Sequence, residues 1–541
     1  MSFFTYRKQF LIPSFELNKE EEKKIDKFLK FLENSGVGYV ISQHVKNNTK
    51  NGGRPSVNYY NLFAVIIYGF AFGRDTLRDL ADACLYDLRY IYIMEQIQPS
   101  YTTISNFINN VIVPNETIIF SLLNIQIKKE LGIEFEDAFL DGTKMEANAN
   151  KYKFVWKPTT YHKNISITFF KLLNDHNICS SFRFEEEVKS KTVALAINEL
   201  YYKKNEFEEN RYKNLLKALT AILTKVVEYE EKENICGPTR KSFYKTDHDA
   251  TAMCLKSDHY SGLGSNMHAA YNIQIIVIKG LVFAYYVSQS RADIDDFIHT
   301  LKLFNELYGE YPKNIGADAG YGSLENYLFL KENNIGNYVK YFSWEGNTSG
   351  KNPDCYVLNN DLSITCLNGN TGFEICLNHR HQKKAGGVFY KVEGCLNCEY
   401  RHYCMRHVKN YEDCNFKIFE VVRELIKYKQ EAEKNLLSIK GIEMRVNRSV
   451  QVEGIFAIEK NDRQYNRIRR RGIKKVSTET MLVYLGMNIK KLYKFYENGK
   501  FPEFWKAPID LEPQKFKKPS AKKLSKKGKK INDKKYNNKQ A

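Results

Sequence analysis

The sequence predicts an α/β protein in which a mixed sheet is flanked by helices and interrupted by insertions. Short runs rich in β-branched and aromatic residues alternate with helical stretches along the middle of the chain. The predicted strands are residues 138–140, 271–278, 281–287, 314–317 and 337–341. Helical patterns follow at 295–307 and 324–332. A chain of 541 residues is also too long for one compact core, so two or three folded units are expected.

The first unit, residues 1–125, is predicted to be helical. Residues 19–34 place their apolar side chains on one side of a helix. Three further helices are predicted after the break at Arg54 and Pro55, with Thr76 capping the second. They span residues 60–69, 77–84 and 102–110. A unit of this size can fold on its own.

The rest of the chain divides by composition. Residues 126–345 hold the first part of the sheet domain and a helical insertion at about 160–245, which is dense in Glu and Lys. Residues 346–414 form a second insertion, rich in Gly, Asn and Cys. Residues 415–505 return to the sheet domain, with helices predicted at 416–439 and 445–469. The basic residues 506–541 are expected to be disordered.

The charge is strongly positive. The chain has 82 Lys and Arg against 63 Asp and Glu, a net charge of +19, and residues 514–541 alone contain twelve Lys and one Asp. A basic body with a basic arm favours a polyanionic partner, most often nucleic acid. The alternative for the arm is a disordered segment that only keeps the protein in solution.

No apolar run reaches the roughly 18 residues that a membrane span requires, and the N-terminus lacks a signal-peptide pattern. We therefore expect a cytoplasmic protein. In a reducing compartment the eleven cysteines indicate metal binding or plain burial rather than disulfides.

Two aspartates follow predicted strands. Asp141 comes directly after the apolar run 138–140, and Asp318 ends the run 314–317 before a Gly-rich turn. Carboxylates at the ends of neighbouring strands can point into one cleft. A strand-end aspartate can equally be a turn or helix cap. Asp249 and Asp293 can each be either a further acid of the site or a cap.

A third acid, Glu453, is predicted within a helix. Lys460 lies seven residues later, two turns along the same face, and Arg448 lies five residues earlier on an adjacent face. The alternative interpretation is an exposed, salt-bridged helix surface.

Three blocks of sequence resemble the signature blocks of DDE transposases of bacterial insertion sequences. They are DGTKMEANANKYKF from Asp141, ADAGYGSLENY around Asp318 and RSVQVEGIFAIEK around Glu453. RRRGIKKV and NIKKLYKF follow the third block, and RPSVNYYNLFAVIIYGFAFGRDTLRDLADAC resembles the N-terminal helical domain of that group. CLNCEYRHYC resembles a cysteine cluster that some members contain before the Glu. The similarity extends in order over about residues 50–500.

The resemblance implies an RNase H-like fold with Asp141, Asp318 and Glu453 as catalytic residues. These carboxylates would hold two Mg²⁺ or Mn²⁺ ions, because hard cations prefer oxygen ligands. Such ions activate a nucleophile and stabilise the leaving oxygen in phosphodiester cleavage. The implied partner is double-stranded DNA, both the element ends and the target, bound by a homodimer in the bacterial cytoplasm at the nucleoid.

The resemblance also implies DNA contacts by basic residues near the acids. The predicted residues are Lys144, Arg448, Lys460, Arg469, Arg470, Arg471 and Lys474. For the arginine run Arg469–Arg471, the alternative interpretation is a solvated turn. One departure concerns Arg448: many relatives place an Arg four residues before the Glu, where this chain has Ser449.

The cysteine cluster predicts a structural zinc site. Cys395, Cys398 and Cys404 supply three thiolates at short spacing, with Cys366 as the fourth ligand. The competing ligands are Cys355, Cys376, Cys414, His402 and His407. The alternative is a loop with unmetallated thiols.

The sequence therefore predicts a transposase that binds the terminal inverted repeats of its element and performs metal-dependent DNA cleavage and strand transfer. Two alternatives stay open: a non-catalytic, sequence-specific DNA-binding protein, and an RNase H-like nuclease without strand transfer.

Overall fold

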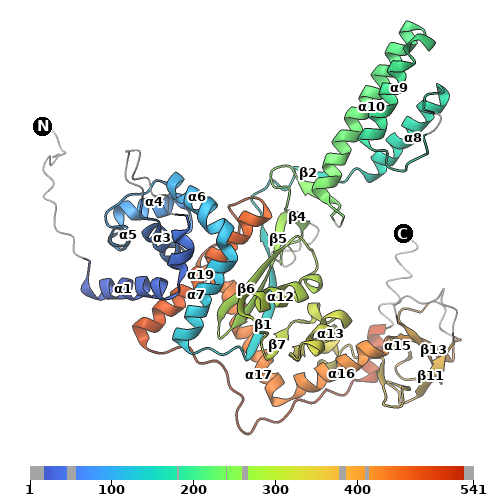
Figure 1. Ribbon diagram of the computed structural model, residues 1–541. Helices are drawn as coiled ribbons and strands as arrows, with labels where there is room; N and C mark the ends of the chain where they lie inside the picture. The colour runs from blue at the N-terminus through green and yellow to red at the C-terminus, as the bar shows by residue number, and fades with distance from the viewer. Residues whose placement is uncertain are drawn as a thin grey trace, which may run out of the picture.

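The computed structural model describes residues 17–44, 57–179, 182–238, 240–256, 258, 266–376, 386–408 and 413–528. A six-stranded mixed sheet lies at its centre, in the order β4-β5-β1-β7-β8 with β6 also paired to β5 (Figure 1). The strands are β1 (Asp137–Glu146), β4 (Thr251–Met253), β5 (His268–Ile278), β6 (Leu281–Ser288), β7 (Asn314–Ala317) and β8 (Gly336–Val339). The predicted mixed α/β architecture is thereby confirmed.

The strand directions divide the sheet in two. β1 runs antiparallel to β5, and β5 runs antiparallel to β6 and β4. β1, β7 and β8 run parallel to one another. β5 and β6 are buried along nearly their whole length, which explains their continuous apolar sequences, because helices cover both faces.

The helices on the two faces come from distant parts of the chain. On one face α12 (Phe297–Tyr308) packs against β5 and β6, after the short turn η4 (Asp293–Asp296). On the other face lie α19 (Ile473–Asn498) and a helix over 439–462, which we call the covering helix. The covering helix consists of α17 (Ile439–Arg448), η7 (Ser449–Glu453), α18 (Gly454–Ala457) and η8 (Ile458–Asp462). α13 (Leu324–Glu332) ends where it was predicted to end and packs beside β8.

The N-terminal segment is helical, as predicted. Its α-helices are α1 (Lys19–Asn34), α2 (Val37–Ser42), α3 (Tyr59–Ala71), α4 (Leu77–Tyr86), α5 (Leu88–Ile93), α6 (Tyr101–Phe107) and α7 (Glu116–Leu131). The turns η1 (Ile108–Ile112) and η2 (Val113–Asn115) join α6 to α7. Thr76 caps α4, because its Oγ1 accepts the backbone N–H of Asp79 at 3.1 Å.

This helical segment shares its apolar core with the sheet. One apolar core extends from Ile25 to Tyr493 and includes residues of the N-terminal helices and of the sheet. α19 joins the two, since it packs against α3, α7 and β6 (Figure 1). Where α19 crosses α3, a Cβ on Gly486 would lie 2.4 Å from the carbonyl oxygen of Phe70. The backbones therefore approach as closely as only glycine permits.

The helical insertion projects away from the body (Figure 1). It contains α8 (Thr159–Asp175), α9 (Ser190–Tyr202), η3 (Lys204–Glu206) and α10 (Glu209–Cys236). A two-stranded ribbon of β2 (Phe154–Trp156) and β3 (Ser242–Tyr244) connects it to the body. Its apolar core is separate from the main one and includes Phe169, Leu200 and Leu219.

The cysteine-rich insertion contains a five-stranded antiparallel sheet in the order β13-β12-β11-β10-β9. Its strands are β9 (Tyr356–Leu358), β10 (Ile364–Cys366), β11 (Thr371–Ile375), β12 (Val388–Glu393) and β13 (Phe416–Val421), with the short helices α14 (Trp344–Ser349) and α15 (Arg401–Cys404). The helix predicted over 416–439 is wrong at its start. Phe419 and Val421 alternate with more exposed neighbours and pair with β12, and the helix α16 (Arg423–Leu437) begins only afterwards.

The start of the basic C-terminal segment differs from the predicted disorder. Residues 506–528 lie along the body: the N–H of Gln514 donates to the carbonyl of Leu437 at 2.9 Å, and Phe516 packs against Trp344. Leu524 is buried. Apolar residues between the lysines explain this attachment, while residues 529–541 lie outside the described residues.

Within the described residues, no helix combines the length and the apolar character that crossing a bilayer demands.

Candidate active site and nucleic-acid interface

Asp141 and Asp318 occupy neighbouring positions on parallel strands. Leu140 of β1 pairs with Ala317 of β7, so the two aspartates are the next residues along each strand. The prediction that the first strand ends at Asp141 is wrong, because β1 continues to Glu146 by pairing with β5. Asp141 therefore lies beside the end of β7. It is still within β1, because β5 pairs with the other edge of this strand.

Gly142 allows β1 to continue there. A Cβ at this position would lie 2.2 Å from Nε2 of Gln274, the residue opposite on β5. Gln274 thus covers the strand directly beside Asp141. The small residues Ala147 and Ala149 beyond the strand are buried.

The covering helix runs along the face of β1 that includes Asp141. Three basic residues of this helix contact alternate positions of the strand, which share one face. Lys440 pairs with Asp137, Arg448 Nη1 lies 3.0 Å from Asp141 Oδ2, and Lys460 donates to the Thr143 hydroxyl. Lys144 lies on the opposite face, so the structure does not bring it to Asp141.

A π-helical turn brings Glu453 close to Arg448. In a regular α-helix, side chains five residues apart point about 140° away from each other. The π turn Ser449–Glu453 widens the helix, and Arg448 Nη2 lies 3.9 Å from Oε1 of Glu453. Arg448 therefore lies between Asp141 and Glu453 and contacts both carboxylates.

The three acids differ in burial. The Asp141 side chain is 17% exposed, whereas those of Asp318 and Glu453 are 53% and 63% exposed. Burial raises the pKa of Asp141, and the nearby Asp318 charge raises it further. The positive charges of Arg448 and Lys256 and the N–H of Gly142 act in the opposite direction on this pKa.

Lys256 is a cation that the sequence did not single out. It acts on Asp141 and also contributes to the lowered pKa of Lys460, which arises chiefly from burial. Lys340 lies 3.9 Å from Asp318. The pattern around Lys256 offered no local signal, because only the tertiary fold brings it to β1.

A polar network lies on the other face of the sheet. Asn272 and Gln274 both donate to Asp293, at 2.8 and 3.0 Å, and Tyr321 donates to Gln274. Burial raises the pKa of Asp296, which accepts from Asn272, to about 7. Asp293 therefore belongs to a network under the sheet rather than to the group of Asp141, Asp318 and Glu453.

Asp249 is a helix cap, one of the two interpretations of its sequence position. Its Oδ2 accepts the N–H of Ile473 at 2.8 Å, and Asp247 accepts the N–H of Gly472 at 3.1 Å. Tyr271 donates to the same Asp247 at 2.9 Å. These contacts fix the start of α19, where the first N–H groups lack intrahelical partners.

The arginine run lies between the N-terminal helices and the sheet. Arg469 pairs with Asp75 at 2.8 Å, Arg470 donates to Asn109 at 3.3 Å, and Arg471 donates to the carbonyl of Asn148 at 2.9 Å. Buried Glu479 accepts the backbone N–H groups of Arg469 and Arg470. The run borders an open groove of about 510 Å³.

Fewer of the basic residues in and after the arginine run are exposed than the sequence predicts. Arg471, Lys474 and Lys475 are exposed, whereas Arg470 is partly buried and its pKa is lowered by that burial. Arg467, which is half exposed, donates to the carbonyls of Ala147 and Ala149.

The predicted cysteine ligands surround one small cavity of about 20 Å³. Cys366, Cys395, Cys398 and Cys404 all border it. Cys404 also contacts Cys355: their hydrogen bond lowers the pKa of Cys355 and raises that of Cys404. Burial raises the pKa values of Cys395 and Cys398, and Cys366 adds to both shifts.

We also considered where three or more His, Cys, Asp or Glu side chains have their ligand atoms within 4.8 Å of one another. In the described part of the chain, this spacing is met only by His162, Glu187 and Glu233. Neither the cysteines nor the three acids meet this spacing. For the acids, the Arg448 guanidinium lies between Asp141 and Glu453.

Two family models match the chain. The Transposase DDE domain matches residues 365–493, and the Transposase domain (DUF772) matches residues 15–110. A search of curated proteins found no significant match, and a search of solved structures found none either. The two matches support a DDE transposase of the insertion-sequence type, which confirms the resemblance predicted from the sequence.

A transposase acts on DNA, and a DDE domain implies metal-dependent nuclease and transposition activity that generally uses divalent ions. The matched segments include Glu453, Arg448 and Lys460 but not Asp141 or Asp318.

Proposed function

We propose that this protein binds the terminal inverted repeats of its insertion sequence and catalyses metal-dependent DNA cleavage and strand transfer. The observation that supports this most is the arrangement of the acids. Asp141 and Asp318 follow paired residues of two parallel strands, and Arg448 connects Asp141 to Glu453 on the covering helix. The mixed sheet with helices on both faces supports an RNase H-like domain.

The three carboxylates are suited to hold Mg²⁺ or Mn²⁺. All their donor atoms are hard oxygens. Two cationic side chains, Arg448 and Lys340, already lie beside them, which indicates a local demand for positive charge. Asp141 has a fixed direction because β5 holds its strand, while Asp318 and Glu453 are exposed enough to adjust. Two bound ions would activate the attacking hydroxyl and offset charge at the phosphate.

The chain's own residues would position the DNA. Arg448 and Lys460 project from the covering helix onto the face of β1 that includes Asp141, where a scissile phosphate would lie. Arg471 and Lys474, together with Lys475, would extend the contact along the DNA backbone. Arg469 and Arg470 would reach DNA only by giving up their contacts with Asp75 and Asn109, and Lys144 faces away.

A Zn²⁺ ion held by Cys366, Cys395, Cys398 and Cys404 would stabilise the small sheet of the insertion, and their common cavity supports this. Cleavage at two element ends favours a homodimer assembled on DNA, at the nucleoid of a bacterial cell.

The test uses duplex DNA that ends in the element's own terminal sequence, with Mg²⁺ and a target plasmid. Purified wild-type protein is expected to nick the element end and to join its 3′-OH to the target. Asp141→Asn, Asp318→Asn and Glu453→Gln should each reduce both steps by at least about 10³-fold while end binding persists, because the ligands for catalysis are lost. Glu325→Gln, an exposed carboxylate near Asp318 in sequence, is the matched control.

The outcomes separate the three candidate functions. Nicking without joined product would favour a nuclease that lacks strand transfer. Tight binding to the terminal sequence, with neither nicked nor joined product from wild type or from Asp141→Asn, would favour a non-catalytic DNA-binding protein.

A further inference from the structure

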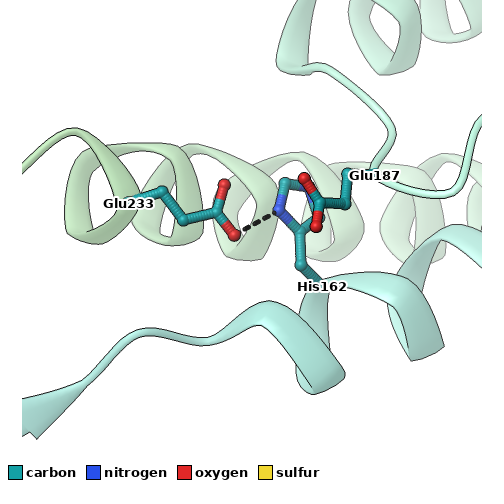
Figure 2. A group of neighbouring side chains, drawn as sticks. All are labelled: His162, Glu187 and Glu233. Atoms are coloured by element: carbon teal, nitrogen blue, oxygen red, sulfur yellow. Dashed lines mark hydrogen bonds and ion pairs between the residues drawn. The ribbon is translucent and has the colours of Figure 1, made fainter. Parts of the chain in front are cut away.

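A second cluster of potential metal ligands lies in the helical insertion, far from the acids in the fold. His162 belongs to the first turn of α8, Glu187 precedes α9, and Glu233 belongs to the last turn of α10 (Figure 2). The ligand atoms of the three side chains lie within 4.8 Å of one another. His162 is fully buried, and the Glu233 side chain is 13% exposed.

The hydrogen bonds of His162 determine which ring nitrogen is available. Nε2 lies 2.9 Å from the carbonyl oxygen of Val188. A carbonyl can only accept, so Nε2 must be protonated and donate. Val188 is itself fixed, because its N–H donates to the Ser166 hydroxyl at 2.7 Å. In a neutral ring, Nδ1 then presents a lone pair.

That lone pair faces a carboxylate. Nδ1 lies 2.9 Å from Oε1 of Glu233, the contact drawn as a dashed line in Figure 2. Two electron-rich atoms at this distance in a buried place repel each other unless a positive charge lies between or beside them. That charge is either a proton, held as an imidazolium or as the carboxylic acid of Glu233, or a metal ion.

The second carboxylate favours the metal. An imidazolium between Glu187 and Glu233 would leave a net negative charge, whereas a divalent ion beside a neutral imidazole would balance both carboxylates. Among the described residues, no Lys or Arg nitrogen lies within 4.0 Å of either carboxylate. Lys163, whose charge reaches Glu187, is paired with Glu186 at 2.6 Å.

The outer contacts of His162 match those of a metal ligand. Histidine ligands usually donate their other ring N–H to a carbonyl or carboxylate, which fixes the ring and its tautomer. The Val188 carbonyl has this role here. One nitrogen and two carboxylate oxygens are suited to Zn²⁺ and other first-row transition metals more than to Mg²⁺, which prefers oxygen alone.

We propose that His162 Nδ1, Glu187 and Glu233 bind a divalent transition-metal ion, with Zn²⁺ as the ion to test. The site would tie together α8, the segment before α9 and the end of α10. These parts meet where the β2–β3 ribbon joins the projection to the body, so the ion would fix the base of the projection. In a tetrahedral site with bonds of about 2.1 Å, ligand atoms lie about 3.4 Å apart, so only small side-chain movements are needed.

The test measures Zn²⁺ binding by the full chain after chelator treatment and dialysis. Glu187→Gln and Glu233→Gln should each bind one equivalent less than wild type, or bind it at least about 100-fold more weakly, since even outer-shell losses cost 10–100-fold. Glu186→Gln, next to the site but paired with Lys163, should bind as wild type does. With Co²⁺, the wild-type minus variant spectrum should lack thiolate charge-transfer bands, which excludes an indirect effect on the cysteines.

A second measurement needs no variant. Adding Zn²⁺ to the metal-free wild-type chain should slow amide hydrogen exchange at Val188 and Ser190, because the ion holds this segment on α8 and α10. Equal Zn²⁺ binding by all four proteins, or no change in exchange at this segment, would overturn the site in favour of a buried imidazolium–carboxylate pair.

Discussion

Arg448 contacts Asp141 and Glu453 at the same time, and its side chain is only 12% exposed. A partly buried carboxylate such as Asp141 needs a cationic partner, because burial disfavours its charged form. In the absence of bound ions, Arg448 supplies that charge. At the residue scale, two of the three acids, Asp141 and Glu453, are therefore linked by the single side chain of Arg448.

Replacing Arg448 by Gln should lower the free energy of unfolding at pH 7 by about 1–3 kcal/mol, since Asp141 would be left buried without its partner. Urea unfolding measures this change. The double variant Arg448→Gln/Asp141→Asn should recover part of the loss, because no unpaired charge remains. Lys475→Gln, at an exposed position, should change stability by less than about 0.5 kcal/mol; an equal loss there would contradict a specific role for Arg448.

The buried Asp296 predicts a pH dependence of stability. Burial raises its pKa from 3.8 to about 7 in the folded protein. The folded state therefore binds the proton more tightly, and this contribution to stability is present below pH 3.8 and lost as the pH rises through about 7. Relative to wild type, Asp296→Asn should become more stable by about 2–4 kcal/mol between pH 4 and pH 8.

Urea unfolding across this pH range tests the prediction for Asp296. The exposed neighbour Asp295 offers a control, since Asp295→Asn should keep a pH profile close to that of wild type. A profile of Asp296→Asn that runs parallel to wild type would show that Asp296 does not titrate in this window.

At the element scale, β1 and the covering helix set the geometry together. β1 extends past the end of β7 because β5 pairs with its second half, and Gly142 leaves room for Gln274. The π turn Ser449–Glu453 adds residues to one turn of the helix, and the side chains of Arg448 and Glu453 therefore lie on the same side of it. Sequence periodicity assumes a regular helix, so it could predict this helix but not the local change in phase.

Gly142→Ala should destabilise the fold by about 1–3 kcal/mol, because the new methyl group would overlap the Gln274 side chain. Gln274→Ala alone is also destabilising, because Gln274 bonds Asp293 and Tyr321, but Gly142→Ala added to Gln274→Ala should cost less than it does in wild type, as measured by thermal unfolding. Gly454→Ala in the covering helix, where an added Cβ meets nothing within 4 Å, should be neutral or stabilising by up to about 1 kcal/mol. Destabilisation by both single changes to the same extent would argue against a specific contact at Gly142.

At the scale of the whole molecule, the N-terminal helices and the sheet share one core. The last long helix, α19, closes this core, since it lies between α3 and β6. The chain must therefore be complete to about residue 498 before its first helices find their full packing. The two insertions, by contrast, have small cores of their own.

Gly486→Ala tests the shared core. The added methyl group would meet the backbone of Phe70 and Ala71, force α3 and α19 apart and cost about 1–3 kcal/mol. Because both units depend on this contact, calorimetry should show the transitions of the N-terminal helices and the sheet shift down together. Gly320→Ala, which meets open space, is the control. A separate early transition of the N-terminal helices, with the sheet unchanged, would contradict the shared core.

The sequence by itself determined the elements whose patterns are local. The bounds of α13, the strand 314–317 and the cap at Thr76 follow from apolar periodicity and turn residues, and the three acids could be named from their blocks. The short strands of the cysteine-rich insertion gave too few residues for a periodic signal.

Only the tertiary structure decided which side chains meet. The pairing of β1 with β5 put Lys144 on the face away from Asp141, and the packing of the covering helix brought Arg448 to Asp141. The approach of α8 to α10 likewise brought His162 to Glu233, 71 residues away. Register and helix packing depend on contacts between distant segments, and no local pattern along the chain encodes them.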